Sequence, residues 1–304
     1  MKNKKKRIII LTSILMLILV FLAITASKNR QFIGLIMLPT QNYKPTEIPV
    51  DTTDLFEIDG FIKNDLVYIY VQGGPNWELF DRRLSPFTWM PHSGTYIRVF
   101  PYQSQILNHS ILASSPPLTA NQAQFEVAVS AEMLYRTIKY FKRRNKKVYV
   151  LCISHGSQIG LEMLKSYPNI SDGLALTMIR LDIDKEAIDL THDGKVPYFN
   201  ENQEVTSRYL LPGILRFQRL NNRVVNMATL MKVSRNRYTE LLKDKDLSNM
   251  VYVFGKNDNK VGYPKQHEIE FLKEKGVKIL ELECGHDDLG GKNYLNKINQ
   301  LLMN

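Results

Sequence analysis

The sequence predicts an α/β fold in which a mainly parallel sheet is flanked by helices and carries an inserted, mainly helical cap. Short apolar runs rich in β-branched and aromatic residues alternate along the chain with longer segments of helical periodicity, as in parallel sheets with crossover helices. Between residues 184 and 249 these runs stop, and polar, basic and helix-compatible residues take over, which indicates an insertion. A hydrophobic share of 44% and a charged share of 23% are ordinary for a globular protein.

Six segments are predicted to be strands because each is a short, continuous run with high β propensity. They are residues 66–71, 96–100, 148–153, 174–181, 250–254 and 277–282. Residues 28–59 contain Pro39, Pro45 and Pro49, which block regular helix, and are expected to form a linker or a first edge element. The core domain is therefore assigned to residues 60–183 and 250–304, and the cap to residues 184–249.

Helices are predicted where apolar residues recur at helical spacing. The longest begins at Thr119, where Gln122 three residues later completes a capping box, and continues to Arg144. Further helices are expected over residues 156–167, 263–274 and 292–303. The long helix ends in a basic cluster that complements the helix dipole, with contact to an anionic lipid or envelope surface as the alternative interpretation. The cluster consists of Lys139, Lys142, Arg143, Arg144, Lys146 and Lys147.

Residues 1–27 have the pattern of an export sequence, with basic residues at 2–7 followed by an apolar stretch at 8–24. The stretch is just long enough to span a bilayer, and small residues near its end only approximate a signal-peptidase site, so a signal anchor and a cleaved signal peptide both fit. The basic flank is expected to stay in the cytoplasm. The rest of the chain is predicted to lie outside it, either membrane-anchored or, after cleavage, secreted or periplasmic.

The net charge of +10 does not favour a nucleic-acid partner, because half of it lies in the basic run at residues 2–7. The chain has two cysteines, which excludes a disulfide-stapled scaffold and an all-cysteine metal site. Cys152 and Cys284 are expected on strands three positions apart, too far for a disulfide, and therefore as free thiols. No metal site is predicted.

Residues 152–156 read Cys-Ile-Ser-His-Gly and follow a predicted strand directly. This is the strand-to-helix turn G-x-S-x-G with cysteine in place of the first glycine. The turn needs very small residues beside the serine and projects the hydroxyl above the sheet. Ser154 is therefore the candidate nucleophile.

A serine hydroxyl needs an imidazole to take its proton and a carboxylate to orient that imidazole. Asp258 and His286 each follow a predicted strand, and the carboxyl ends of parallel strands meet at one edge of a sheet. Ser154, Asp258 and His286 are therefore expected to converge as a catalytic triad. Asp182 and Asp184, at the end of another strand, remain alternatives for the acid.

An oxyanion intermediate needs two backbone NH donors. We assign one to His155, directly after the serine, and the other to Gly74, within a Gly-Gly-Pro segment that follows the first predicted strand. Trp77, Leu211 and Phe217 are predicted to line the substrate pocket, with packing inside their own segments as the alternative.

Together, residues 72–75, residues 152–156, Asp258 and His286 resemble the α/β-hydrolase superfamily over most of residues 60–304. The resemblance implies an eight-stranded, mostly parallel sheet, a serine hydrolase triad and a cap inserted after the sixth strand. The segment Gln-Gly-Gly-Pro at 72–75 is similar to the His-Gly-Gly-Pro of proline iminopeptidase-like members, with Gln72 replacing the histidine.

The sequence thus predicts an exported or membrane-anchored serine hydrolase that acts on a small-molecule or lipid-like carboxylic ester through an acyl-enzyme on Ser154. This chemistry needs no metal or organic cofactor. Three alternatives remain: an amidase or peptidase, an acyltransferase using the same triad, and a catalytically silent binding protein.

Overall fold

A computed structural model describes residues 38–60, 63–79, 96–192, 195–208, 218–231, 237–290 and 292–303. The chain divides into two units, Met1–Pro39 and Thr40–Asn304, and every element named below belongs to the second. The predicted leader at residues 1–27 lies outside the described residues, as do Leu211 and Phe217. No helix of the described segments is both long and apolar enough to cross a membrane.

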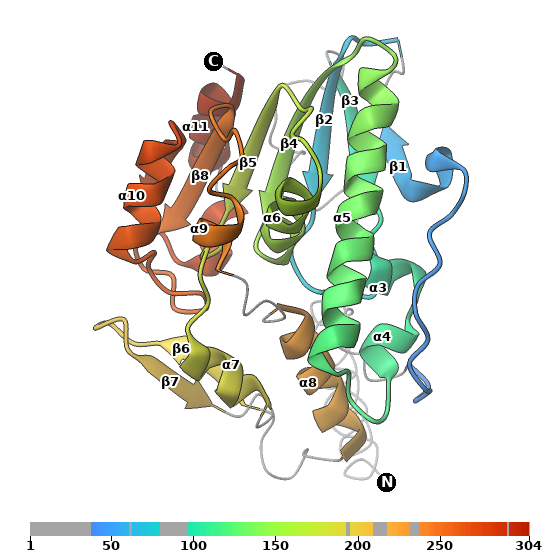
Figure 1. Cartoon of the computed structure of the whole chain (residues 1–304), viewed down its shortest axis with the longest axis vertical. Helices are drawn as coiled ribbons and strands as arrows, with labels where there is room; N and C mark the ends of the chain where they lie inside the picture. Colours follow the sequence, from blue (N-terminus) through green and yellow to red (C-terminus); the bar gives the residue numbers. More distant parts are fainter. Residues whose placement is uncertain are drawn as a thin grey trace, which may run out of the picture. The chain divides into compact units, whose positions relative to one another are not determined.

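The second unit is built on a seven-stranded sheet with strand order β1-β3-β2-β4-β5-β8-β9 (Figure 1). Its neighbouring strands run parallel, except that β1 pairs antiparallel with β3 at the edge. The prediction of a mostly parallel sheet is confirmed, and of the eight strands that the resemblance implied, seven lie in the described residues. The strands are β1 (Phe56–Asp59), β2 (Leu66–Val71), β3 (Tyr96–Pro101), β4 (Lys147–Ile153), β5 (Gly173–Thr177), β8 (Met250–Gly255) and β9 (Lys278–Leu282).

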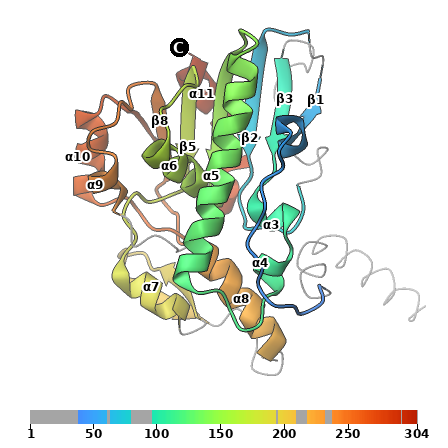
Figure 2. The ribbon, with the colours of Figure 1, turned by 45° about the vertical axis from the view of Figure 1, so that its right-hand side comes forward.

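Helices cover both faces of the sheet. On one face, α5 (Ala120–Lys142) and α6 (His155–Ser166) pack on the central strands, and on the other α11 (Lys292–Met303) packs on β5, β8 and β9 (Figures 1 and 2). Burial on both faces explains why the central strands read as continuous apolar runs. α5 begins at the predicted capping box, in which Thr119 Oγ1 accepts from Gln122 N and Gln122 Oε1 accepts from Thr119 N.

The remaining short elements of the core lie in its connections. They are η1 (Thr52–Leu55), α3 (Ser104–Leu107), α4 (Ser110–Ala113), α9 (Tyr238–Leu241), α10 (Gln266–Glu274) and η4 (His286–Gly290). β5 ends at Thr177, earlier than predicted, because Met178 adopts a positive φ of 53° that extended strand does not allow.

The segment predicted as a cap, residues 184–249, contains α7 (Lys185–His192), the antiparallel hairpin β6 (Val196–Phe199) with β7 (Val205–Arg208), and α8 (Gln218–Met231). It also contains α9, which contacts α6 of the core. The hairpin was not predicted. Its strands are short and include a proline and polar residues, so they lack the apolar run that marks a buried strand. The backbone NH of Phe199 donates to the carbonyl of Asn259, which follows β8, so the hairpin is attached at the carboxyl ends of the strands.

Asn226 anchors α8 to the core. Its side chain is fully buried, and its Nδ2 lies 3.2 Å from the Leu112 carbonyl and 3.1 Å from the Ser114 carbonyl. Its Oδ1 accepts from the Leu118 NH at 2.7 Å. The amide therefore satisfies the backbone of the connection between α4 and α5.

Candidate active site

Ser154 occupies a sharp turn between β4 and α6. Its backbone has φ 51° and ψ −115°, a conformation that is strained for a residue with a Cβ atom. The Ser154 NH donates to the Thr177 carbonyl at 2.9 Å, and its own carbonyl accepts from Ser157 N at 2.8 Å as α6 begins. The neighbouring strand and helix thus hold the strained serine at the carboxyl end of the sheet.

Gly156 is required because α6 packs directly against the end of β2. A Cβ atom at this position would lie 2.3 Å from the Val71 carbonyl oxygen and 2.7 Å from that of Gln72, closer than any side chain tolerates. The small residue predicted after the serine is therefore imposed by backbone contact. A larger residue would push α6 and the turn away from the sheet.

Cys152, which replaces the first glycine of the turn, is accommodated one turn into the helix. A Cβ atom at Gly160 would lie 3.1 Å from Cys152 Sγ and 2.7 Å from Leu176 Cδ2. The missing side chain at Gly160 thus leaves the space that the cysteine fills. Sequence reasoning overlooked Gly160, although a glycine inside a helix that follows an unusual turn was the available signal.

Ser157, also overlooked, fastens the turn to two strands. Its Oγ accepts from Thr177 N at 2.8 Å and lies 2.8 Å from the carbonyl oxygens of Cys152 and Thr177. The side chain is fully buried. It fixes the first turn of α6 relative to the ends of β4 and β5, and so fixes Ser154.

The structure brings the three predicted triad residues together. His286 Nε2 lies 2.9 Å from Ser154 Oγ, and His286 Nδ1 lies 2.7 Å from Asp258 Oδ2. The other carboxylate oxygen of Asp258 accepts from the backbone NH groups of Lys260 and Val261 at 2.9 and 3.0 Å. Asp258 is buried, whereas the His286 side chain keeps an exposure of 11%. The imidazole is therefore oriented by a fixed carboxylate and still reachable from outside.

Two loops carry the acid and the base, and direct contacts hold them together. A Cβ atom at Gly255 would lie 2.5 Å from the Cys284 carbonyl oxygen, so glycine permits the close approach of the two strand ends. That same carbonyl accepts from Asn257 N at 3.1 Å. Lys260 Nζ pairs with Asp287 Oδ1 at 2.7 Å and joins the loops at the surface. The separation of Asp258 from His286 is thus set by backbone packing.

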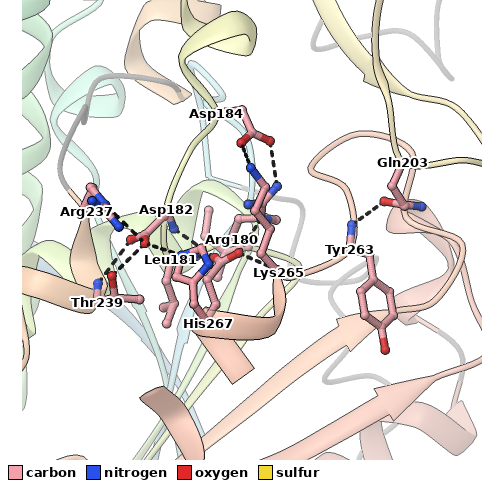
Figure 3. A network of polar contacts seen from close by, with 12 residues as sticks. Arg180, Leu181, Asp182, Asp184, Gln203, Arg237, Thr239, Tyr263, Lys265 and His267 are labelled. Atoms are coloured by element: carbon pink, nitrogen blue, oxygen red, sulfur yellow. Dashed lines mark hydrogen bonds and ion pairs between the residues drawn. The ribbon is translucent and has the colours of Figure 1, made fainter. Parts of the chain in front are cut away.

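The alternative acids are bound elsewhere. Asp182 Oδ2 accepts from Thr239 Oγ1 at 2.7 Å and lies 2.9 Å from His267 Nε2 (Figure 3). Asp184 pairs with Arg180 at 3.0 Å and with Lys265. Both carboxylates therefore belong to a polar network around α10, and Asp258 is the acid that the structure places on His286.

His155 begins α6, where backbone NH groups of the first turn have no carbonyl partner within the helix. Its ring is buried, with Nδ1 3.3 Å from Gln158 Oε1, and burial lowers the pKa of His155 to about 4. The ring is consequently neutral near pH 7. The ring of His155 is therefore part of the core, and the role predicted for its backbone NH stays a prediction.

The glycine segment after β2 runs beside the serine. A Cβ atom at Gly73 would lie 3.5 Å from Ser154 Cβ, and Gly74 has a φ of 148°, a conformation that favours glycine. Gln72, in place of the histidine of the resembling motif, donates from Nε2 to the Glu78 carbonyl at 2.9 Å and accepts at its own carbonyl from Gln103 at 2.7 Å. It braces the segment that contains Gly74.

Trp77 is half-buried in that segment. Its ring packs edge to face with His109, with centroids 5.8 Å apart, and its carbonyl oxygen lies 3.1 Å from His109 Nε2. These contacts hold Trp77 against the short helices before α5. Of the three residues predicted to line the pocket, Trp77 is the one that the structure describes.

Among the described residues, no group of three or more histidine, cysteine, aspartate or glutamate side chains is arranged to hold a metal ion. Cys152 and Cys284 are free and buried, as expected. Burial raises the pKa of both thiols, that of Cys284 to about 11, so neither is a thiolate near pH 7. Ser154 is therefore the nucleophile candidate at this edge of the sheet.

No protein-family model matches the chain, and no curated protein sequence was found to match it. Solved structures are similar in fold. A thermophilic esterase from Thermogutta terrifontis superposes with a TM-score of 0.52 at 15% identity, covering 82% of this chain and 92% of that one. An α/β-hydrolase enzyme, MGS-M2, from a Medee basin deep-sea metagenome gives 0.51 at 14% identity with the same coverage.

A third similar structure is the 2-hydroxy-6-oxo-6-phenylhexa-2,4-dienoate hydrolase of Rhodococcus sp. strain RHA1, with a TM-score of 0.50, 14% identity and coverage of 82% and 92%. At such identities the similarity establishes the fold. The chain has the α/β-hydrolase fold, as the resemblance in the sequence implied.

Proposed function

We propose that this protein is a serine hydrolase that cleaves a carboxylic ester through an acyl-enzyme on Ser154. The observation that carries the proposal is the hydrogen-bonded chain from Asp258 through His286 to Ser154, placed on a strained turn between a strand and a helix. A serine that only caps a helix does not require hydrogen bonds to an imidazole that is itself bound to a buried carboxylate.

Each group has a role that follows from its contacts. His286 takes the Ser154 proton at Nε2 as the hydroxyl attacks the ester carbonyl, and then gives it to the leaving alcohol. Asp258 accepts from Nδ1, which keeps the correct tautomer and stabilises the imidazolium. The backbone NH groups of Gly74 and His155 hold the oxyanion. Water activated by His286 then releases the acid and frees Ser154.

An ester is favoured as substrate because similar folds include an esterase and other hydrolases, and because the triad needs no cofactor to cleave esters. We propose a small-molecule or lipid-like ester. Amide cleavage and transfer of the acyl group to an acceptor other than water use the same groups, so they are alternatives that substrate tests distinguish.

The test is hydrolysis of p-nitrophenyl esters of increasing acyl length, compared with the matching anilides, by the full chain and by Ser154→Ala. The exposed Ser248→Ala serves as the matched control. We expect ester turnover above the anilide rate, lost in Ser154→Ala and kept in Ser248→Ala. Turnover that survives in Ser154→Ala contradicts the proposal, and a folded wild type inert toward all substrates favours the silent binding protein.

We further propose that residues 1–27 hold the protein at a membrane with the hydrolase domain outside the cytoplasm. The basic run and the apolar stretch of the sequence support this proposal. Protease added to intact cells should digest the domain, and alkaline extraction should leave the full chain with the membrane. Protection from protease in intact cells contradicts the orientation.

A further inference from the structure

A hollow of about 260 Å³ lies on the outer face of α5 and is lined by Thr52, Arg136, Lys139, Tyr140, Arg143 and Arg144. We call it the α5 hollow. Positions 136, 139, 140, 143 and 144 share one face of a helix because they are separated by three or four residues. Thr52 comes from η1, which packs against α5. Four cationic side chains thus surround one small space.

The structure separates the basic residues at the end of α5 into two groups. Lys142 pairs with Asp172 at 2.8 Å, Lys146 pairs with Asp65 at 3.1 Å, and Lys147 lies over the Tyr149 ring. Within the described segments, by contrast, no carboxylate comes within ion-pair distance of Arg136, Lys139, Arg143 or Arg144. All four cations that line the α5 hollow are thus without a carboxylate partner in the described segments, although Lys139 lies 5.5 Å from the Tyr135 ring centroid.

Two of the guanidinium groups are already fixed. Arg136 Nη2 donates to the Val50 carbonyl at 2.7 Å. Arg144 lies 3.5 Å above the Tyr140 ring centroid, and its Nη1 donates to the Tyr140 carbonyl at 3.0 Å. Each guanidinium has five N–H donors, so a single backbone contact leaves donors for a ligand. The groups therefore lose little freedom on binding an anion.

Cations at the end of a helix also offset its dipole, which amounts to roughly half a negative charge. The four positive charges around the hollow exceed the half charge of the dipole. They also repel one another, because like charges three or four residues apart on a helix are neighbours. Asp51 on the η1 side is exposed and turned back onto its own segment, where its Oδ1 accepts from Thr53 N at 2.8 Å. The dipole and this carboxylate therefore leave an excess of positive charge.

We propose that the α5 hollow is a binding site for a phosphate group. Arginine matches the geometry of phosphate oxygens with paired donors, and several arginines around one space are typical of phosphate recognition. The volume lies just below the roughly 300 to 1,000 Å³ of pockets for drug-sized ligands, which suits a small anion. The phosphate is carried either by a free anion or by a lipid headgroup.

The site is separate from the proposed active site. Lys147 begins β4 near the end of α5, whereas Ser154 follows the other end of this strand. A seven-residue strand spans roughly 23 Å at about 3.3 Å per residue. Binding at the α5 hollow is consequently independent of the proposed hydrolase function, and the two can be tested apart.

The experiment is calorimetric titration of the full chain, in a non-ionic detergent at low salt, with four probes. Inorganic phosphate and pyrophosphate represent free anions, and glycerol 3-phosphate and glycerophosphoglycerol represent lipid headgroups. We expect saturable one-to-one binding of at least one probe, and the tightest probe identifies the source of the phosphate. Absence of saturable binding for all four overturns the proposal.

The two pairs of variants each remove two positive charges from α5 and the residues directly after it. Arg136→Gln with Arg143→Gln takes two cations from the α5 hollow, and Lys142→Gln with Lys146→Gln takes two that are already paired. We expect the dissociation constant to rise at least tenfold in the first pair and less than twofold in the second. An equal rise of the dissociation constant in both pairs, or no rise in the first pair, overturns the proposal.

Folding of each variant is checked by circular dichroism and thermal unfolding, which should match the wild type and do not depend on the proposed hydrolase function. If the double arginine variant does not fold, the single variant Arg143→Gln is used instead, because Arg143 is exposed and forms no ion pair within the described segments. A rise of at least threefold in the dissociation constant then supports the site, and an unchanged constant overturns it.

Discussion

Asp258 uses both carboxylate oxygens, one for His286 and one for the backbone NH groups of Lys260 and Val261. Asp258→Asn keeps the shape but replaces an acceptor with an amide that can present an NH₂ group to Nδ1, which favours the wrong imidazole tautomer. We expect kcat for ester hydrolysis to fall on the order of 10⁴-fold.

The control for this variant is Asp182→Asn, at the acid bound to Thr239 and His267. It should leave kcat within a few-fold of the wild type. The measurement is steady-state hydrolysis of the best p-nitrophenyl ester by both variants. A larger loss in Asp182→Asn than in Asp258→Asn would reassign the acid.

His155 links stability to pH because its buried ring has a pKa of about 4, against an ordinary value of 6.5. Between these two values the unfolded chain binds a proton that the folded chain does not, so stability falls as the pH is lowered from 6.5 to 4. The contribution is on the order of 3 kcal/mol. His155→Gln should therefore show a weaker acid dependence of its denaturant midpoint than the wild type, measured from pH 7 to pH 4. Parallel curves would count against the buried neutral ring.

At the residue scale, the sequence predicted which side chains meet but not how they are supported. Ser154, Asp258 and His286 follow strand ends, so their convergence could be expected, and the structure brings them together; their catalytic roles remain predictions. Asp182 also follows a strand, so sequence alone left the acid open. Ser157 was missed because its importance arises from packing between a helix and strands, which has no local signal. For Gly160 the glycine inside a helix was a signal, but the cysteine that it accommodates could be identified only from the structure.

Between β4 and α6, Cys152 and Gly160 form a complementary pair. Gly160→Ala places a methyl group 3.1 Å from Cys152 Sγ. Overpacking of this kind is expected to lower the free energy of unfolding by about 1 to 3 kcal/mol, and the higher helix propensity of alanine offsets part of that loss. Adding Cys152→Gly should recover part of this loss. Urea unfolding of both single variants and the double variant measures the coupling, and strictly additive effects would contradict it.

A buried ion pair lies where α10 meets the chain on either side of the segment that contains α7, the β6–β7 hairpin and α8. Glu268 is fully buried and accepts from Arg180 Nε at 2.9 Å and from the backbone NH groups of Leu181 and Asp182 at 2.7 and 3.0 Å. Figure 3 shows Asp182 continuing this network to Thr239, at the return from that segment. The network thus fixes both ends of the insertion relative to α10.

Glu268→Gln keeps the volume but removes one of the two carboxylates that pair with the buried Arg180, and Asp184 remains as the other. Removing the sole partner of a buried charge costs about 3 to 5 kcal/mol, so with Asp184 still in place we expect the free energy of unfolding to fall by about 1 to 3 kcal/mol. The control on the same helix is Glu270→Gln, which is exposed, and it should change stability by less than about 0.5 kcal/mol. Urea unfolding measures both. Similarly small changes in the free energy of unfolding for the two variants would show that the Glu268 network does not stabilise the fold.

At the element scale, long periodic segments and apolar runs were predicted well, as α5 and α11 illustrate. The hairpin of β6 and β7 was not, because four-residue strands are specified by their tertiary contacts, here the contact of Phe199 with Gly262 and Asn259. The antiparallel direction of β1 was also open, since the prolines before it indicated only a linker or an edge element.

For the whole molecule, the alternation of strands and helices was sufficient to predict a parallel α/β sheet, and this prediction is confirmed. The strand order was not derivable from the alternation, because it depends on which crossovers pack together. The described unit carries two features at opposite ends of β4: a hydrogen-bonded triad at the carboxyl end and a cluster of unpaired cations near the amino end. The export prediction rests on residues 1–27 and remains a prediction.

The central claim is that Ser154 is an activated nucleophile, and reaction with a fluorophosphonate followed by mass spectrometry of the digested full chain tests it most directly. We predict one modified peptide, carrying the adduct on Ser154, with the modification abolished in Ser154→Ala, reduced at least a hundredfold in His286→Ala and unchanged in Ser248→Ala. A folded wild type that takes up no probe, or that is modified equally fast in His286→Ala, would contradict the account.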